Sequence, residues 1–365
     1  MDLFPAPESP KLPDDRHRHP FHMYEMIRRQ PIAARTTLTA VQEWAPPALP
    51  AVGRVLFTGI GTSYHAALAL ARAAAGEKAP SLHHALAVPA FELRNDPPGL
   101  DDIGLVVAVS ASGDTDVTLR AARKWKAAGV PVLAITATEK SPLAAEADAV
   151  LATRYADEAS FAHTVSYTAA LVAGLALLAK WAPADADRLA QLETLPDALT
   201  AAVASEGRFV DVAERWADRP HWFLAGSGPR AATVREACLK LREAAGRFAA
   251  PVGIEELLHG PFGAVDDKSV VIALTGTALE AERARQGIQA AQDLGAETLH
   301  LDSTPGASGP AAWTPEPLPG PLAPVVDIVP FQFLAYWMAV STGRNPDVIG
   351  YDDPRHRTAR SRYGL

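Results

Sequence analysis

Two halves of the chain carry the same pattern. Residues 55–61 (VLFTGIG) and 222–228 (WFLAGSG) are both apolar runs that end in Gly-x-Gly before small residues. The likeness continues where 106–109 corresponds to 271–274, and where 128–136 corresponds to 294–302. Strand-like and helical stretches alternate at short intervals in both halves, which is typical of parallel sheets covered by helices. The sequence therefore predicts an α/β protein with two tandem doubly wound parallel-sheet domains, each with its ligand site beyond the carboxyl ends of the strands.

The length of 365 residues also favours two domains, because it exceeds the usual size of one hydrophobic core. We expect an N-terminal arm and helix, a first domain, a second domain and a C-terminal tail, at 1–45, 46–185, 205–345 and 346–365. The first 20 residues are rich in proline and charge and are expected to form a mobile arm. A helix should follow from His22 to about Gln42, interrupted at Pro31. A helical connector is expected from about Ala182 to Arg219.

Composition excludes several classes of function. The net charge of −8 argues against nucleic-acid or anionic-membrane partners. The single cysteine, Cys238, excludes an internal disulfide and fits a cytoplasmic protein, and we interpret it as a small buried hydrophobe. The apolar run 169–179 is too short to span a bilayer.

The sequence gives no indication of a cofactor. A dinucleotide site calls for Gly-x-Gly-x-x-Gly, but Tyr64 and Ala231 stand at the third glycine, so we discount NAD. His17, His19 and His22 lie close together, but a flexible arm does not hold metal ligands in geometry. We therefore expect neither a cofactor nor a metal.

Residues 105–115 (LVVAVSASGDT) are a buried-strand pattern that stops abruptly in hydroxyl groups and a glycine. A helix should open at this point, and its unpaired N–H groups favour a bound anion. The segment is therefore a candidate phosphate cradle. The alternative is that Ser110, Ser112 and Thr115 only cap the helix and form its turn.

The segment from Arg230 to Phe248 reads as a helix that places Glu236, Lys240 and Glu243 on one face. From spacing alone, a solvated face with helix ion pairs explains this pattern better than a catalytic cluster does. His259 precedes Gly-Pro and is expected to be a positioned loop histidine. For His65, in the first predicted helix, structural and ligand-contacting roles remain open.

Four motifs in this order carry a family resemblance: Gly61-Thr-Ser-Tyr64, Ser110-x-Ser-Gly-Asp-Thr115, Glu236-x-x-x-Lys-x-x-Glu243 and His259-Gly-Pro261. Together they are similar to the double SIS (sugar isomerase) domain family, whose domains are flavodoxin-like. They resemble in particular the isomerase half of glutamine:fructose-6-phosphate amidotransferases. The resemblance covers roughly residues 22–360.

The resemblance implies roles for individual residues. The sugar phosphate would be held by Thr62, Ser63, Ser110, Ser112 and Thr115, with further substrate contacts from Gly61, Ala111, Gly113, Glu236 and Arg360. Glu243 would move a proton between C1 and C2 of the open-chain sugar, and Lys240 would contact the same site. His259 would assist ring opening in the neighbouring subunit of a homodimer, and the tail would close the active site.

The chemistry of aldose–ketose interconversion suits these residue types. A proton alpha to a carbonyl must be removed, for which a carboxylate is suited, and a histidine titrates in the range needed to shuttle protons among sugar oxygens. A phosphate held far from the reacting carbons positions the substrate.

Departures from the family pattern narrow the reaction. Only about 45 residues precede the first domain, so glutamine hydrolysis by an N-terminal glutaminase is not expected. The family's tail lysine is absent, and the nearest basic residue, Arg360, is a poor imine former. The segment 159–165 (ASFAHTV) replaces the family's Val-Ala-Ser-Thr-Lys, so contacts to sugar hydroxyls should differ.

These observations favour a cytoplasmic phosphosugar enzyme that acts on a hexose or hexosamine 6-phosphate by C1/C2 enolisation. An amino-sugar phosphate deaminase is preferred, with an aldose–ketose isomerase close behind. Two alternatives remain at this point: a non-catalytic sugar-phosphate-binding regulator, and a deglycase of a sugar-phosphate amine adduct.

Overall fold

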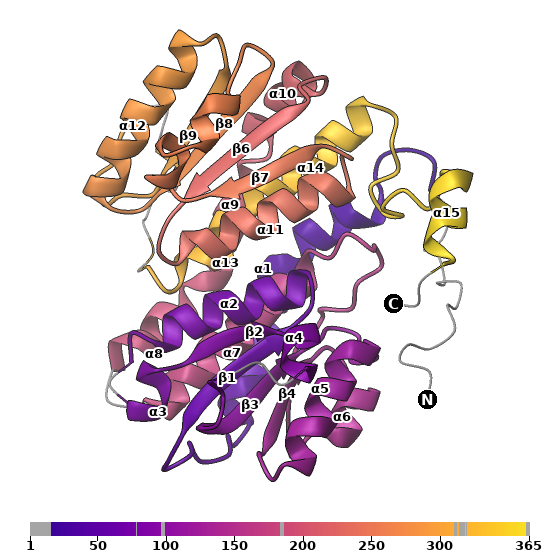
Figure 1. The fold of residues 1–365 in the computed structure, drawn as a ribbon, viewed down its shortest axis with the longest axis vertical. Coiled ribbons are helices and arrows are strands. Elements are labelled where there is room, and N and C mark those ends of the chain that lie inside the picture. Colours follow the sequence, from indigo (N-terminus) through magenta and orange to yellow (C-terminus); the bar gives the residue numbers. More distant parts are fainter. Residues whose placement is uncertain are drawn as a thin grey trace.

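Two parallel β-sheets, each flanked by helices, build the protein (Figure 1). The computed structural model describes residues 16–77, 79–95, 99–182, 186–309, 312–313, 318 and 320–362. The first sheet has the order β2-β1-β3-β4-β5 and the second β7-β6-β8-β9. The strand order of the second sheet repeats the first four strands of the first sheet, which confirms the predicted tandem, doubly wound α/β architecture.

The first half alternates strands and helices. Its strands are β1 (Arg54–Gly59), β2 (Leu86–Pro89), β3 (Ile103–Val109), β4 (Val132–Thr136) and β5 (Ala149–Ala152). Its helices are α2 (Thr62–Ala74), α3 (Pro80–His83), α4 (Ala90–Arg94), α5 (Asp116–Ala127), α6 (Pro142–Glu146) and α7 (Val165–Trp181). Strand β3 shows why the apolar run is continuous: Val107 and Val109 enter one core cluster, whereas Val106 and Ala108 enter another on the opposite face.

The second half is built in the same way. Its strands are β6 (His221–Gly226), β7 (Phe248–Val252), β8 (Ser269–Thr275) and β9 (Glu297–Asp302). Its helices are α11 (Arg230–Glu243), α12 (Ala278–Asp293), α13 (Ala323–Asp327), α14 (Val329–Ser341) and α15 (Pro354–Arg360), with 3-10 turns η1 (Glu256–Leu258) and η2 (Pro261–Ala264). The two sheets have matching strands at the positions where the sequence repeat predicts them.

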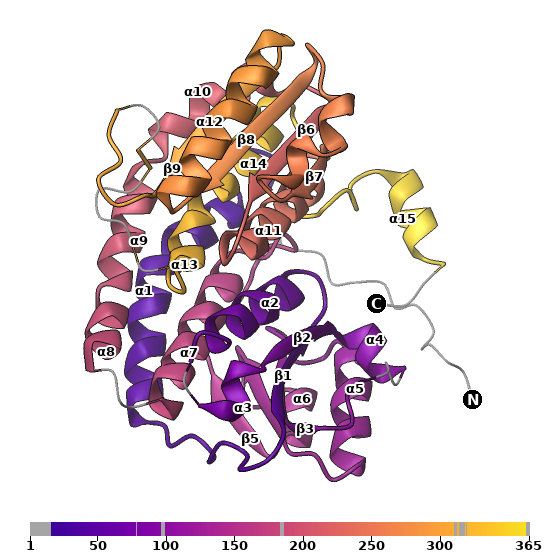
Figure 2. The same ribbon diagram turned by 60° about the vertical axis from the view of Figure 1, so that its left-hand side comes forward.

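Helices link the two halves and lie between the sheets. Helix α1 (His22–Glu43) and the connector helices α8 (Ala186–Glu193), α9 (Leu195–Ala204) and α10 (Gly207–Trp216) run along one side (Figure 2). One large core cluster includes Leu70 of α2, Leu177 of α7, Cys238 of α11 and Phe333 of α14. The two halves therefore share apolar packing, and α2 and α11 are held against each other at the centre of the molecule.

Helix α1 corrects one prediction. It runs through Pro31 without the predicted interruption. Proline has no N–H to donate to the carbonyl of Ile27, but the Gln30 side chain donates its Nε2 to that oxygen at 2.9 Å and so replaces the missing hydrogen bond. Residues 1–15 of the predicted mobile arm lie outside the described residues. From Arg16 to Pro20 the chain is largely exposed, and His19 Nδ1 lies 2.7 Å from the Tyr336 hydroxyl.

The predicted helix 230–248 ends at Glu243 in the structure. The chain then turns at Gly246, whose φ of 64° lies in the left-handed region, and enters β7 at Phe248. The Arg344 guanidinium lies where a Cβ on Gly246 would stand, but it is the end of a flexible side chain, so the positive φ is the reason for glycine at this turn.

The stretch Ala323–Ser341 is long and apolar enough, by length and composition, to cross a membrane. From the sequence, only the apolar run 169–179 was considered, and this stretch was overlooked. In the structure 89% of its apolar window is buried, as expected of a core helix pair.

Candidate active site

The candidate site is centred on the point where α2 and α11 cross between the sheets. Gly61, with a φ of 55°, turns the chain from β1 into α2 and places Thr62 in the first turn of that helix. Helix α11 presents Glu236, Lys240 and Glu243 on one face. The predicted shared face is therefore confirmed, but it is not solvated, because the side chains of Glu236 and Lys240 are 0% exposed.

Lys240 joins three groups. Its Nζ lies 3.3 Å from Glu236 and 2.5 Å from Glu243, and it donates to the Thr62 hydroxyl at 3.2 Å. Thr62 in turn donates its own proton to Glu236 at 3.0 Å. A buried ammonium thus holds two carboxylates and a hydroxyl in fixed positions, as preorganised chemistry requires.

His65 adds a fifth member that sequence reasoning left open. Its Nδ1 lies 2.7 Å from Glu236, one turn of α2 beyond Thr62. The sequence offered one signal for this role. Thr62 and His65 are at positions i and i+3 of a predicted helix, which share a helix face, so His65 could have been placed beside Thr62. In this structure His65 orients Glu236.

Opposing effects set the protonation of the cluster. Burial alone would raise the pKa of Glu236, but the Lys240 ammonium and the hydrogen bonds from His65 and Thr62 lower it below the ordinary value. Burial would lower the pKa of Lys240, but the two carboxylates raise it. Burial raises the pKa of Glu243, with the nearby Glu236 charge adding to this effect and Lys240 opposing it. Glu243 is therefore the better proton acceptor of the two carboxylates.

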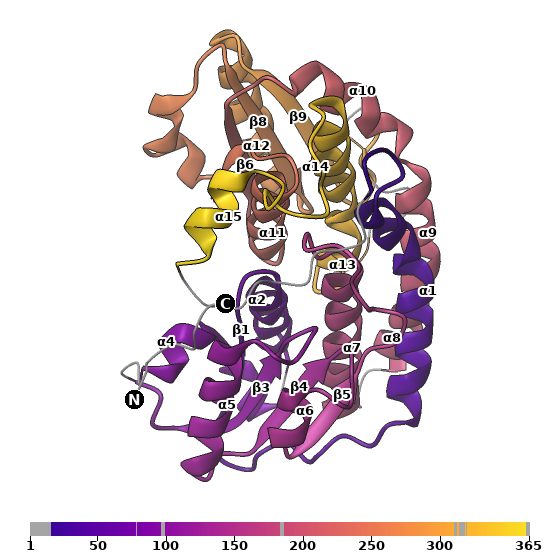
Figure 3. The same ribbon diagram turned by 90° about the vertical axis from the view of Figure 1, so that its right-hand side faces the viewer.

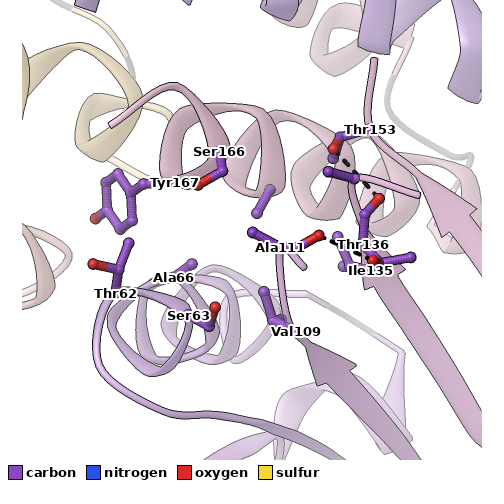
Figure 4. A pocket seen from close by; sticks show the side chains of 12 residues that line it. Thr62, Ser63, Ala66, Val109, Ala111, Ile135, Thr136, Thr153, Ser166 and Tyr167 are labelled. Carbon is purple, nitrogen blue, oxygen red and sulfur yellow. Dashed lines mark hydrogen bonds between the residues drawn. The ribbon is translucent and has the colours of Figure 1, made fainter. Parts of the chain in front are cut away.

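A small pocket opens beside the cluster at the carboxyl ends of β1, β3, β4 and β5 (Figure 4). Its wall carries six hydroxyl groups, from Thr62, Ser63, Thr136, Thr153, Ser166 and Tyr167. The predicted residues Thr62, Ser63 and Ala111 line it. This hollow lies where parallel sheets bind their ligands.

The predicted cradle forms a tight turn next to this pocket. The Gly113 N–H donates to the Ser110 hydroxyl at 3.2 Å, and Ser110 lies 3.5 Å from the Thr115 hydroxyl. Ser112 is exposed and donates to Asp114. Thr115 is the N-cap residue of α5, but its side chain makes no capping hydrogen bond. The Thr115 hydroxyl therefore does not cap α5, whereas the Ser110 hydroxyl, by accepting from Gly113, stabilises the turn as the alternative proposed.

A further carboxylate, Glu158, reaches the site region and was missed in the sequence. Its Oε1 accepts hydrogen bonds from the N–H groups of Thr164 and Ser166, at 2.6 and 2.8 Å, and so caps the start of α7. Burial raises its pKa to about 7, against the effect of these hydrogen bonds and of Lys240. An acidic residue shortly before an apolar helix was the only sequence signal.

Two predicted site residues do not join the cluster within this chain. His259 follows η1, its side chain is 68% exposed, and its Nε2 lies 2.9 Å from Glu255. Arg360 lies at the end of α15, where it donates to the Ile349 carbonyl at 2.8 Å and stacks over the Tyr351 ring. Helix α15 stands on the opposite side of the molecule from α1 (Figure 3).

The described residues contain no group of three or more His, Cys, Asp or Glu side chains arranged to hold a metal ion. Cys238 lies on α11 and is buried, as predicted, and burial raises the pKa of its thiol to about 12.

Comparison with known proteins shows which proteins the chain resembles. A SIS domain model matches residues 49–180. The chain is 32% identical over 362 residues to a glutamine–fructose-6-phosphate aminotransferase (isomerizing) of Symbiobacterium thermophilum, and covers 58% of that protein's length. Among solved structures, the C-terminal domain of glucosamine-fructose-6-phosphate aminotransferase from Francisella tularensis gives a TM-score of 0.79 at 23% identity, covering 92% of this chain and all of that one.

A glucosamine-6-phosphate deaminase from Thermotoga maritima gives a TM-score of 0.69 at 22% identity, covering 89% of this chain and 95% of that one. At these identities the two structures establish the shared fold. The sequence match runs over little more than half of the curated relative, which confirms the expected resemblance to its isomerase half.

Proposed function

Because a SIS domain model matches residues 49–180 and the chain resembles the isomerase half of glutamine–fructose-6-phosphate aminotransferases, we propose that it is a phosphosugar enzyme that works by enolisation at C1 and C2 of an open-chain sugar phosphate. The observation that carries this proposal is the buried Lys240 ammonium that holds Glu236, Glu243 and Thr62 beside a hydroxyl-lined pocket. We further propose that the substrate is an amino-sugar phosphate and that the enzyme is a deaminase.

In the proposed mechanism the phosphate sits in the turn 110–115 and among the hydroxyls of Thr62 and Ser63. Backbone N–H groups at the start of α5 and the hydroxyl groups supply neutral donors to this anion. Binding energy from the phosphate then positions the far end of the sugar against Glu243.

Glu243 carries one proton from C2 to C1. Removal of the C2 proton of a 2-amino aldose, with protonation of O1, gives an enolamine. Return of the proton at C1, with loss of one proton from the amino nitrogen, gives a 2-imine. One water adds at C2 and one ammonia leaves, so the products are a ketose phosphate and ammonia. Lys240 and Thr62 are positioned to stabilise the oxygen charge that develops in the enolised intermediate. An aldose–ketose isomerase would use the same proton transfer without the hydrolysis.

We propose that the active form is a homodimer, with His259 supplied by the partner subunit. The exposed position of His259, away from its own chain's cluster, supports this arrangement. The tail that contains Arg360 would close over the site, and we place the reaction in the cytoplasm.

Exchange of the C2 proton of glucosamine 6-phosphate with deuterium from solvent, followed together with ammonia release, tests the enzyme class. Glu243→Gln should abolish both signals, whereas the exposed control Glu139→Gln, whose carboxylate pairs with Arg154, should retain them. Wild-type exchange in Glu243→Gln would refute the assignment of the base. Exchange without ammonia would indicate an isomerase, and tight hexose phosphate binding without turnover would indicate a regulator. Amine release only from an Amadori-type adduct would indicate a deglycase.

Mixing two inactive variants tests the shared site. Glu243→Gln and His259→Ala chains, unfolded and refolded together, should recover about a quarter of wild-type activity, because half of the dimers then hold one intact site of two. No recovery, with mixed dimers demonstrated by mass, would place His259 in its own chain's site. Full activity of His259→Ala by itself would place His259 outside the reaction.

A further inference from the structure

The sequence repeat gives the catalytic cluster a counterpart in the second half of the chain. Gly61 and Gly228 are equivalent in the repeat, and with φ values of 55° and 53° they turn the chain in the same way into α2 and α11. Lys240 of α11 donates to Thr62 at the start of α2. Arg72, in the last turn of α2, donates to the Gly228 carbonyl at the start of α11. Each of the two helices therefore sends a cation to the start of the other.

The second domain does not offer the same cradle turn to a ligand, because its own side chains fill it. The counterpart of the cradle is 275–277, at the end of β8. The Gly276 N–H donates to Glu280 Oε2 at 2.9 Å, and the Arg230 guanidinium lies where a Cβ on Gly276 would stand. Arg230 is in turn paired with the buried Asp327 at 2.8 Å. A ligand of the second domain must therefore bind elsewhere.

A second pocket, of about 380 Å³, opens beyond the carboxyl ends of β6 and β7. Its lining includes Arg72 of α2, Arg235 of α11, the segments 226–228 and 251–253, and Glu255 and Glu256. It shares no lining residue with the hydroxyl-rich pocket of the candidate active site. The end of the sheet at which it lies is the one where doubly wound sheets bind ligands, and its volume suits a small molecule.

The two arginines of this pocket are not neutralised by a carboxylate. Among the residues that the structure describes, neither Arg72 nor Arg235 forms an ion pair, and Arg72 donates only to the Gly228 carbonyl. Burial lowers the pKa of Arg72, and the nearby charge of Arg235 adds to this effect. Both residues are exposed, so a ligand can reach them. Two like charges that share a pocket favour an anion bound between them.

The acidic residues of the lining have other partners. Glu255 pairs with Arg283 and with His259. Glu256 Oε2 accepts the Gly253 N–H at 3.1 Å. Its second oxygen, Oε1, has no hydrogen-bond partner within the described part of the chain and can accept from a hydroxyl or ammonium group. The pocket thus offers two free cations and one hydrogen-bond acceptor.

We propose that this pocket is a second, non-catalytic site that binds a small phosphomonoester. Arg72 and Arg235 hold the phosphate, and Glu256 accepts a hydrogen bond from a polar group of the remainder. A phosphomonoester carries nearly two negative charges at pH 7 and has three free oxygens. It therefore matches two guanidinium groups better than a carboxylate does.

Equilibrium dialysis with radiolabelled glycerol 3-phosphate tests the proposal. This probe is a phosphomonoester with two hydroxyl groups, and it has no carbonyl group to enolise. Arg72→Gln/Arg235→Gln should weaken binding at this site by about 100-fold or more, because two charge-assisted contacts are lost. The variant should then bind one probe molecule fewer per chain than the wild type. Lys268→Gln/Arg285→Gln removes two exposed charges from the same domain outside the pocket, and this control should bind as many as the wild type.

A second variant guards against an effect on folding. Arg235→Glu changes one exposed side chain that has no ion-pair partner among the described residues, and it should also lose one probe molecule per chain at an unchanged Tm. Wild-type stoichiometry and affinity in Arg72→Gln/Arg235→Gln and in Arg235→Glu would overturn the proposal. Glycerate that binds this site as tightly as glycerol 3-phosphate would overturn the assignment of a phosphate.

The partner subunit of the proposed homodimer is the competing occupant. If Arg72→Gln/Arg235→Gln converted a dimer to monomers by mass while probe binding stayed unchanged, the pocket would be a contact for a second chain and the proposal would be wrong. The outcome does not depend on turnover. Loss of one probe molecule in a protein that processes no sugar phosphate would support this site and refute only the proposed enzyme activity.

Discussion

Replacing Lys240 by methionine tests the central claim about the site, namely that one buried cation holds two carboxylates together. Methionine keeps the length and apolar stem of the lysine and removes its charge. The substitution leaves Glu236, whose side chain is 0% exposed, without its ammonium partner, while Glu243 also loses its contact at 2.5 Å. His65 and Thr62 remain as hydrogen-bond partners of Glu236.

The expected cost follows from the burial. Removing one partner of a fully buried ion pair costs about 3–5 kcal/mol, because an uncompensated charge stays inside. The halves share one large core, so unfolding as a single unit is expected. For 365 residues the entropy of unfolding is then about 0.8 kcal/mol per degree. The Tm of Lys240→Met should therefore fall by about 4–7 °C at pH 7.5.

The stability deficit, meaning the free energy of unfolding that Lys240→Met loses relative to the wild type, should depend on pH in a definite direction. In the wild type the pKa of Glu236 is lowered, so its contribution to stability persists above the ordinary pKa and is lost only as pH falls through the lowered value. In Lys240→Met burial is no longer offset by the ammonium, so the pKa of Glu236 should rise above its ordinary value. The folded variant then binds a proton more tightly than the unfolded chain. The stability deficit should therefore become smaller as the pH falls from 8 to 5.

Thermal unfolding followed by circular dichroism at pH 5, 6, 7 and 8 checks both parts. Lys180→Met is the matched control, because Lys180 donates only to the carbonyls of Gln42 and Trp44 and should cost about 1 kcal/mol at every pH. Adding Glu236→Gln to Lys240→Met should recover part of the loss. A deficit below about 1 kcal/mol, or one that is equal at pH 5 and pH 8, would refute the reasoning.

Two further predictions concern the cradle and the cysteine. Gly113→Ala should lower the free energy of unfolding by at least about 1–2 kcal/mol and weaken inorganic phosphate binding about 10-fold or more. The reason is that Gly113 has a φ of 67° and that an added Cβ would collide with the Ser141 side chain. Gly129→Ala, with a φ of 83° and open space, is the control, and equal effects of the two substitutions on phosphate binding would argue against a cradle. The Cys238 thiol, buried and with its pKa raised to about 12, should react with an aromatic disulfide reagent only after unfolding, and rapid labelling of the native protein would contradict its burial.

Several features were predictable because they follow from local pattern. Strand β3 is a continuous apolar run since both of its faces are covered, and the same pattern at β8 revealed the repeat. The order of Glu236, Lys240 and Glu243 placed them on one helix face, because side chains at these spacings share a face on any α-helix. These inferences need only the periodicity of strands and helices, which the chain carries locally.

Other features depended on partners far along the chain. The uninterrupted α1 requires the Gln30 side chain to replace a backbone donor, and that amide is itself held by Gln332 at 2.8 Å. Propensity favours a break in α1 at Pro31, but the hydrogen bonds of the Gln30 side chain let that helix continue. Helix α11, by contrast, ends at Glu243, and the chain then turns at Gly246, a local signal that the predicted bounds overlooked.

The sequence by itself determined the repeated α/β architecture and the residue types that face one another on α11. Only the tertiary structure decided between a solvated ion-pair face and a buried cluster, because helical spacing is the same in both. Packing of α2 against α11 removes water from Lys240 and brings Thr62 and His65 to Glu236, across more than 170 residues. Burial, which no local pattern encodes, converts three ordinary helix residues into a preorganised set of charges.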